Sequence, residues 1–411
     1  MTSLRALRPA FPILLGASLM LTLSMGIRQS LGIFMQPLTR DIGISISEFT
    51  VAIAIQNLAW GFTQPIAGAY AARYGFRPVV LIGAGLYIAG LVLMAASQGF
   101  LSIMIGAGVL IGTSLSCIAS SVSMAVAARS VPTSSRSLVL GIVSAAGSLG
   151  ALIAAPLGQA LNQEYGWRIG IAGFIILSLA LIPATWLAGK VDKLPLPPAP
   201  SNDIDGVSAK TVIGRALGNV SFIVMTMAYF VCGMQLVFLT THLPTYLAIC
   251  GMDPMLSAQT LGVIGGFNVI GSLFFGWAGD RWNKLALLGG IYFSRSLILG
   301  WYFMQVPTPT TTLIFAALMG FLWLGVGPLV AGAIVEMFGL KWQAMIAGLA
   351  FMSHQLGSFL GALGGGLIYD SLGSYTLAWQ AGVTIGLTAG IVQIAFALIR
   401  PSEPPMALQT Q

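Results

Sequence analysis

Residues 341–370 read KWQAMIAGLAFMSHQLGSFLGALGGGLIYD, and this stretch determines what kind of protein the chain encodes. The segment is apolar almost throughout and long enough to cross a bilayer as one helix. His354 lies midway along it, flanked by Ser353 and Gln355. A polar group at that depth needs a partner or a watery cavity, whereas small residues let neighbouring helices approach closely. Small residues recur beside the histidine at helical spacing: Ala347, Ala350, Gly357, Ser358 and Gly361.

The same helix has a relative in the first half of the chain. Gly141–Gly158, GIVSAAGSLGALIAAPLG, aligns with Gly348–Gly365, GLAFMSHQLGSFLGALGG, at an offset of 207 residues. His354 stands where the first copy has Gly147, so we interpret the two halves as having diverged around a binding site. Three pairs in order at nearly one offset predict two parallel six-helix halves. The other two pairs are residues 26–37 with 233–244, and 68–75 with 276–283.

The composition predicts an α-helical membrane protein that crosses the bilayer many times. The 411 residues are 57% hydrophobic and only 7% charged, with a mean hydropathy of +0.91, whereas ordinary domains carry about 25% charged residues. The net charge of +7 needs no nucleic acid to explain it, because the basic residues gather in alternate loops. The three cysteines form no disulfide or metal pattern, so we expect no metal and no cofactor.

We predict twelve spans and one long polar connection between the sixth and the seventh. That connection, residues 190–218, is rich in Pro, Ser and Asp, as is typical of a linker. We therefore expect six-helix bundles at 1–189 and 219–411, joined by a linker at 190–218. The spans are expected at about 10–35, 50–72, 79–97, 102–127, 137–160, 169–189, 219–247, 257–278, 285–305, 310–335, 342–369 and 375–399.

The distribution of Lys and Arg predicts the orientation, since cytoplasmic loops carry the basic excess. One side of the predicted membrane has only Arg40 and Arg168, and Arg28 and Arg295 fall inside spans. Both termini and the linker lie on the other side, which we therefore expect to be cytoplasmic. That side collects Arg5, Arg8, Arg73, Arg77, Arg129, Arg136, Lys190, Lys193, Lys210, Arg215, Arg281, Lys284, Lys341 and Arg400.

The loop after span 8 carries a recognisable motif. Residues 276–281, GWAGDR, resemble the G-x-x-x-D-R loop signature of the major facilitator superfamily. The first-half copy at 68–75 keeps its glycines but has Ala72 where the family usually has an acid. The resemblance covers the whole chain and implies the major facilitator fold, with spans 1, 4, 7 and 10 around a central cavity. It also implies a gating role for Arg73, Asp280 and Arg281.

Within that superfamily, three segments are similar to bacterial members of the monocarboxylate transporter group, to which the oxalate:formate antiporter also broadly belongs. These segments are GIRQSLGIFMQPL, FVCGMQLVFLTTHLPTYL and HQLGSFLGALGGG. The relatives often carry an arginine on span 8, four residues before the loop glycine. Here that position is Ser272, with Asn268 one turn earlier. The resemblance therefore implies a small organic anion as substrate without identifying which one.

Two arginines inside spans are candidate anion-binding residues. An arginine in hydrocarbon costs roughly 3 kcal/mol or more, and its planar fork suits a carboxylate, phosphate or sulfonate. Arg28 lies in span 1, past its middle; the alternative role is a structural arginine bonded to backbone carbonyls. Arg295 lies near the middle of span 9, where packing or gating competes with substrate contact.

The two histidines and several amides complete the candidate site. His354 is predicted to bind substrate or carry a proton, or else to be a satisfied polar core group. His242 lies near the outer end of span 7 and fits an outer gate or a second proton route. The amides either orient a small solute or only bond helix to helix. They are Gln29, Gln56, Asn57, Gln64, Gln235, Asn268 and Gln355.

Absent residue types narrow the function further. No Asp or Glu lies in the middle of a predicted span, which argues against the transport of cationic drugs. The sequence has no P-loop and no nucleophile–base pair, so neither ATP-driven transport nor an enzyme is indicated. We predict a monomeric secondary transporter of a small organic anion, preferably a monocarboxylate, in a bacterial inner membrane. Proton symport through His354 and anion exchange without a proton both stay open, as does export of a neutral or amphiphilic compound.

Overall fold

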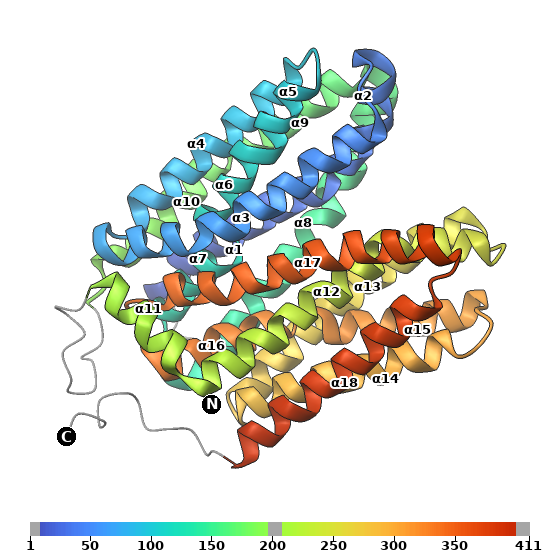
Figure 1. Ribbon diagram of the computed structural model, residues 1–411. Coiled ribbons are helices and arrows are strands. Elements are labelled where there is room, and N and C mark those ends of the chain that lie inside the picture. The colour runs from blue at the N-terminus through green and yellow to red at the C-terminus, as the bar shows by residue number, and fades with distance from the viewer. Residues whose placement is uncertain (1–8, 196–207, 400–411) are drawn as a thin grey trace. The chain divides into compact units, whose positions relative to one another are not determined.

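The computed structural model describes residues 9–195 and 208–399, and all regular structure in these residues is helical (Figure 1). Arg5, Arg8, Arg400 and the middle of the predicted linker lie outside the described residues. Eleven helical runs in the described part are long and apolar enough to cross a bilayer. The twelfth span is α3 (Ile46–Tyr74), which has 29 residues but carries three amides, Gln56, Asn57 and Gln64. The prediction of an all-α membrane protein with twelve spanning helices is confirmed.

The described residues group into two compact units, the first made of 9–195 with 340–352 and the second of 208–339 with 353–399. The predicted boundaries at 189 and 219 stay a prediction. The first unit contains α1 (Phe11–Ser30), α2 (Met35–Ile42), α3, α4 (Phe76–Ala95), α5 (Phe100–Ile103), the π-helical segment Met104–Leu110, α6 (Ile111–Ile118), α7 (Ser120–Ser130), α8 (Arg136–Tyr165), α9 (Trp167–Leu179) and α10 (Leu181–Ala188).

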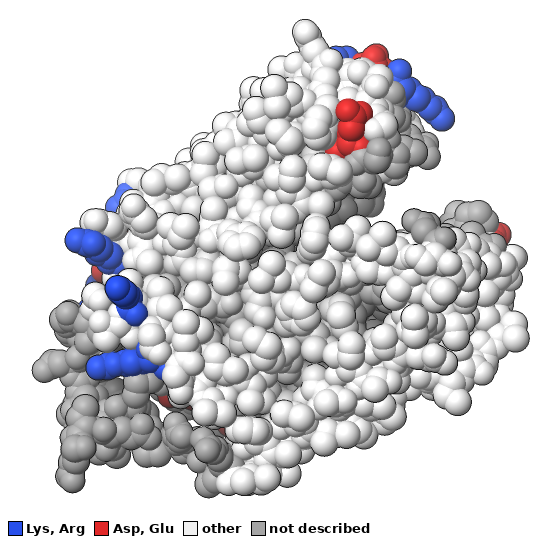
Figure 2. All heavy atoms as spheres, viewed as in Figure 1, with Lys and Arg blue, Asp and Glu red and all other residues white. Residues whose placement is uncertain are grey.

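The second unit contains the helices that follow the linker. They are α11 (Ala209–Gly218), α12 (Val220–Ile249), α13 (Pro254–Gly279), α14 (Lys284–Phe303), α15 (Pro309–Trp323), α16 (Val326–Phe338), most of α17 (Gln343–Leu372) and α18 (Thr376–Ile399). The surface visible along α12, α17 and α18 in Figure 2 is almost free of charged side chains, as a lipid-facing surface requires.

Glycines bring paired helices into backbone contact in each unit. In the first unit α1 packs against α8, and a Cβ added to Gly150 would fall on the carbonyl of Thr22. The Thr22 hydroxyl also donates to the carbonyl of Ala146 at 2.8 Å. In the second unit Gly357 of α17 lies equally close to the backbone of α12, where its Cβ would meet Phe230. Gly150 and Gly357 are separated by the repeat offset, so the repeated small residues serve the same close helix crossing.

A short hydrogen-bonded cluster joins the region after span 1 to the start of α9. Asp41 accepts hydrogen bonds from the indole nitrogen of Trp167 at 2.9 Å and from Arg168 at 2.6 Å. These bonds lower the pKa of Asp41 below its ordinary value, and the bond from Trp167 has the larger effect. The Asp41 bonds therefore stabilise the fold fully at pH values above the ordinary aspartate pKa. This stabilisation is lost as the pH falls through the lowered pKa of Asp41.

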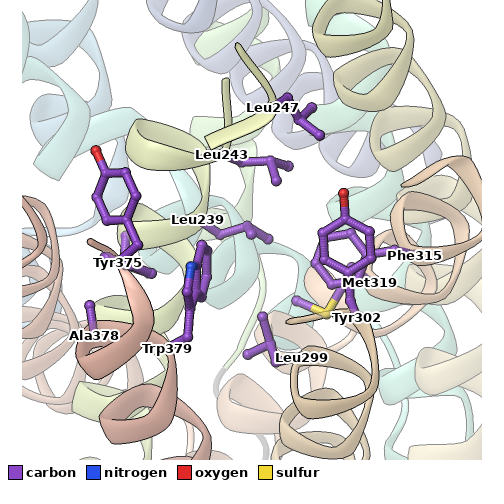
Figure 3. Close-up of a cluster of buried hydrophobic side chains, with 11 residues drawn as sticks. Leu239, Leu243, Leu247, Leu299, Tyr302, Phe315, Met319, Tyr375, Ala378 and Trp379 are labelled. Carbon is purple, nitrogen blue, oxygen red and sulfur yellow. The ribbon is translucent and has the colours of Figure 1, made fainter. Parts of the chain in front are cut away.

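Aromatic and aliphatic side chains from four helices form a core in the second unit (Figure 3). Tyr302 of α14 stacks on Phe315 of α15 with ring centroids 4.2 Å apart, and Trp379 of α18 meets Phe238 of α12 edge-on at 4.4 Å. The leucines of α12 lie between these pairs in Figure 3. The rest of the cluster is Leu239, Leu243, Leu247, Leu299, Met319, Tyr375 and Ala378.

Candidate functional site

Arg28 lies in the last turn of α1, half-buried, and makes its side-chain contacts with α3. Its Nε donates to Oε1 of Gln56 at 3.1 Å, and its Nη2 donates to Oδ1 of Asn57. Its Cζ lies 5.1 Å from the ring centroid of Trp60, within range of a cation–π contact. These three residues lie on one face of α3, so one helix orients the whole guanidinium.

This arrangement leaves one edge of the Arg28 fork free. A guanidinium has five N–H groups in a fixed planar geometry and accepts nothing. The two amide oxygens of Gln56 and Asn57 engage Nε and Nη2, while Nη1 has no partner within residues 9–195 and 208–399. The edge formed by Nη1 and Nη2 can bind a carboxylate through two parallel hydrogen bonds, as can the edge formed by Nε and Nη2 that the amides occupy. The site is therefore shaped to receive a planar oxyanion.

The charge of Arg28 is not neutralised by the protein groups around it. Gln56, Asn57 and Trp60 are all neutral, and none of the ion pairs in the described residues involves Arg28. A charge removed from water and left without a counter-ion is destabilising. A monoanion on the free edge would offset that charge.

Gln56 is itself held from the far side by an irregular helix. Only 1% of Gln56 is exposed, and its Nε2 donates to the carbonyl of Ala107 at 2.6 Å. Ala107 belongs to the π-helical segment Met104–Leu110. Gly112, two residues beyond that segment, approaches the backbone of Gln56 so closely that a Cβ would lie 2.6 Å from its carbonyl oxygen. Gln56 therefore positions Arg28, and the segment positions Gln56.

Sequence reasoning missed two members of this network. Trp60 follows Gln56 by one helical turn, so the spacing on α3 was the signal that would have found it. Tyr87 of α4 donates to the carbonyl of Ser24 at 2.8 Å, one turn before Arg28, and no local pattern indicates that contact. Gln29, which was predicted to bind substrate, is exposed and makes no hydrogen bond within the described residues.

A second polar cluster lies in the second unit around Arg295. This side chain is fully buried on α14, where Nη1 lies 3.2 Å from the sulfur of Cys232, while Nε and Nη2 have no partner within the described residues. His354 of α17 lies near Tyr229 of α12, with ring centroids 4.6 Å apart and an angle of 51° between the rings. Arg295 and His354, which the sequence placed on different spans, thus each contact α12, at Cys232 and Tyr229 respectively.

The neighbours of His354 on α17 are also polar. Its Nδ1 lies 3.3 Å from Oε1 of Gln355 and 3.4 Å from the hydroxyl of Ser358. Gln355 is 4% exposed, whereas His354 is only half-buried. The imidazole therefore has hydrogen-bonding neighbours but is not enclosed.

Gln235 and Asn268 are engaged in contacts between helices. The Gln235 amide donates to the hydroxyl of Ser296 at 3.1 Å and to the carbonyl of Gly382 at 2.9 Å, which joins α12 to α14 and α18. Oδ1 of Asn268 accepts from the backbone N–H of Leu324 at 3.0 Å, at the break between α15 and α16. These bonds correspond to the helix-bonding role that the sequence left open for both residues.

His242 has both ring nitrogens occupied. One, Nε2, lies 2.9 Å from the carbonyl of Ala362, and Nδ1 lies 3.2 Å from the hydroxyl of Tyr375. His242 is 7% exposed, and its ring centroid lies 5.0 Å from that of Phe238, a member of the aromatic core. A neutral imidazole that donates from Nε2 and accepts at Nδ1 satisfies both contacts.

The residues with an implied gating role lie at helix ends. Arg73 is exposed at the end of α3, and Asp280 is half-buried just after α13. Arg281 donates to the carbonyl of Trp277 at 3.2 Å and stacks over its ring.

The first unit has a different acid near the loop that lacks one at Ala72. Asp192 accepts from the backbone N–H groups of Phe76 and Arg77 at 2.9 and 2.8 Å and lies 3.9 Å from Arg129. It therefore caps the start of α4. Sequence reasoning missed Asp192 because it is more than 110 residues away from the backbone groups that it binds.

Comparison with known proteins gives one consistent result. The profile of the Major Facilitator Superfamily matches residues 17–362. Monocarboxylate transporter 13 of Bos taurus is 24% identical over 97% of this chain and 93% of its own length. The uncharacterized MFS-type transporter YcxA of Bacillus subtilis is 25% identical over 90% of this chain and 91% of its own.

Solved structures agree with this at the level of the fold. The proton:xylose symporter XylE is similar with a TM-score of 0.71 and 15% identity, and 96% of each chain is covered. The fucose:proton symporter FucP of E. coli also has a TM-score of 0.71, with 17% identity over 96% of this chain and 99% of its own. At these identities the likeness concerns the fold alone.

A carboxylate placed beside Arg28 should block anion binding at its free edge. We expect small carboxylates to raise the unfolding temperature of the wild-type protein in a thermal-shift assay, because a ligand bound to the folded state stabilises it. Gln56→Glu should abolish this increase, since the new carboxylate neutralises the guanidinium.

Two matched variants isolate the charge. Gln56→Met loses the bond to Ala107 without adding a charge and should keep at least part of the response. Gln29→Glu adds the same charge at an exposed residue next to Arg28, and this variant should keep most of the increase in unfolding temperature. A full response in Gln56→Glu would show that anions do not bind at Arg28.

Proposed function

Because this chain belongs to the Major Facilitator Superfamily, we propose that it moves a small organic anion, a monocarboxylate, across the membrane by alternating access. The family and the curated relatives make the chain a multi-pass membrane transporter rather than an enzyme. Relatives named monocarboxylate transporters support the proposed substrate class. The observation that carries the proposal is the uncompensated Arg28 with one free edge of its fork.

In the proposed mechanism, Arg28 supplies the positive charge, and its neighbours on α3 fix the orientation of the guanidinium. A carboxylate accepts two hydrogen bonds from Nη1 and Nη2, while Gln56 and Asn57 hold the guanidinium in place. The loaded site is then electrically neutral. A neutral complex loses less free energy than a bare cation when the site closes to water, so closure is favoured once the anion is bound. Arg73, Asp280 and Arg281 are proposed to act at the helix ends during closure.

The proposed site also bears on the two alternative functions, export of a neutral or amphiphilic compound and anion exchange without a proton. An exporter of neutral or amphiphilic compounds would gain nothing from an unpaired guanidinium edge. An anion exchanger without a proton would use the same Arg28 contact, and only its coupling would differ. We keep Gln235, Asn268 and Gln355 as proposed second-unit contacts, although the first two are already bonded to neighbouring helices.

Reconstituted protein tests the substrate class directly. Proteoliposomes should take up short monocarboxylates with saturation, and the matching amides should neither be transported nor compete. Arg28→Lys keeps the charge but loses the planar fork, so uptake should fall about tenfold or more. Gln380→Ala, at an exposed amide of α18, is the control and should transport as the wild type does. Equal uptake of acids and amides would contradict the proposal.

We propose that a proton accompanies the anion through His354. Arg295 and His354 contact residues three positions apart on α12, Cys232 and Tyr229, and two cations close together repel each other. The negative charge of an anion in the transport site would offset that repulsion, so the proton should bind after the anion. Both His242 nitrogens already have partners, which makes His242 the weaker candidate for proton transfer.

The His354 variant separates symport from exchange. His354→Gln should still exchange labelled for unlabelled substrate across proteoliposomes. It should lose accumulation driven by a pH gradient, because glutamine keeps a hydrogen bond but carries no proton. His242→Gln is the matched control and should keep more of the gradient-driven uptake. If His354→Gln accumulates substrate as the wild type does, exchange without a proton is the better account.

We propose the inner membrane of a bacterial cell as the location, with both termini cytoplasmic and a monomer as the working unit. The basic residues at one side of the predicted spans support this orientation. Alkaline phosphatase fused to either terminus should be inactive in cells, and an active fusion would reverse the orientation.

A further inference from the structure

We propose that a groove on the second unit binds an anionic phospholipid of the surrounding bilayer. The groove lies among α13, α14 and α15 and has a volume of about 310 Å³. Phe275 of α13 and Leu322 of α15 line its apolar part, and Trp282 and Asn283 lie at the end where α14 begins. All of these residues belong to one unit, so the groove is a property of that bundle alone.

The groove is open because small residues follow one another along α14. Ala286, Gly290 and Ser294 are one turn apart and all line it. A Cβ added to Gly290 would meet nothing within 4 Å, so the space beside it is empty of protein. The helix rises about 15 Å from Lys284 to Ser294. That is about half of a hydrocarbon core of roughly 30 Å, the depth that an acyl chain of one leaflet occupies.

A cation with unused donors is next in the sequence to Trp282, one of the residues that line the groove. Arg281 is exposed and precedes Trp282, and its one hydrogen bond within the described residues is to the carbonyl of Trp277. Its other N–H groups can bind a phosphate. The nearby Lys284 is already paired with Glu336, so Arg281 supplies the charge. A phosphate at Arg281 with a chain along Gly290 therefore matches both the polar end and the apolar length of the groove.

The chemistry distinguishes this groove from the proposed transport site. No charged side chain lines the groove, so a short carboxylate would lose its hydration without gaining a counter-ion inside. Trp282 is 53% exposed at the start of α14, where an aromatic ring at the membrane–water interface sits beside lipid headgroups. An anionic headgroup gains from Arg281, whereas a zwitterionic one carries a compensating positive charge.

Native mass spectrometry of the delipidated full-length protein tests the proposal, with phosphatidylglycerol and phosphatidylcholine of equal chain length as probes. The wild type should bind phosphatidylglycerol about fivefold more tightly, as one basic residue near the membrane surface would give. Gly290→Leu should lower phosphatidylglycerol binding at least fivefold, because its side chain fills the groove. Arg281→Gln should reduce the preference between the two lipids to near parity.

Gly85→Leu is the matched control. Gly85 is an exposed glycine on α4, and a Cβ there also meets nothing within 4 Å. This variant should bind both lipids as the wild type does, and unfolding temperatures will show that all variants are folded. Unchanged phosphatidylglycerol binding in Gly290→Leu would overturn the groove as the site. Equal binding of the two lipids by the wild type would overturn the role of Arg281. If a neutral sterol, added as a third probe, bound more tightly than phosphatidylglycerol, the proposal that the groove binds an anionic phospholipid would be wrong.

Discussion

An arginine within a membrane span must find something to offset its charge, and the account of this protein depends on how Arg28 does so. Its neighbours on α3 are two amides and an indole, which orient the guanidinium without neutralising it. Orientation without neutralisation is what a reversible anion site requires. A carboxylate from the protein would stabilise the arginine more, but it would also compete with the ligand.

The rest of the first unit keeps that arrangement in place. The glycine contact between α1 and α8 fixes the helix that carries Arg28, and the capping box of Ser45 and Glu48 fixes the start of α3. Gln56 then connects the arginine to a π-helical segment, a kind of irregularity that is frequent at functional sites. A change of that segment to regular α-helix would move the carbonyl of Ala107 and with it the amide that holds Arg28. The anion site and the shape of this span are thus physically linked.

Most of the fold could be predicted from the sequence because the features that determine it lie within short segments of the chain. Length and hydropathy define the spans, and the repeat pairs contain glycines that serve equivalent helix contacts, as Gly150 and Gly357 do. Arg28 was found for a similar reason, since a charge in an apolar segment is visible without a structure. The role of Gln56 as its support needed the register of α3 against α1, which no local pattern encodes.

Contacts between residues far apart in the sequence could not be predicted either, because no local pattern encodes them. Asp192 caps α4 from a distant part of the chain, and Ala72 alone gave no hint of it. For Gln235 and Asn268 the sequence left open a role in the cavity and a role in bonding helix to helix, and each is bonded to a neighbouring helix. Polarity within a span identifies a residue that needs a partner, and only the packing shows whether that partner is protein or ligand.

The most direct test of the central claim is a structure of the protein with a bound bromo-substituted monocarboxylate, located by the anomalous signal of bromine. The account predicts one carboxylate within hydrogen-bond distance of both Nη1 and Nη2 of Arg28, with Gln56 and Asn57 still bonded to the guanidinium. A carboxylate bound at Arg295 instead, with the free edge of Arg28 unoccupied, would contradict it.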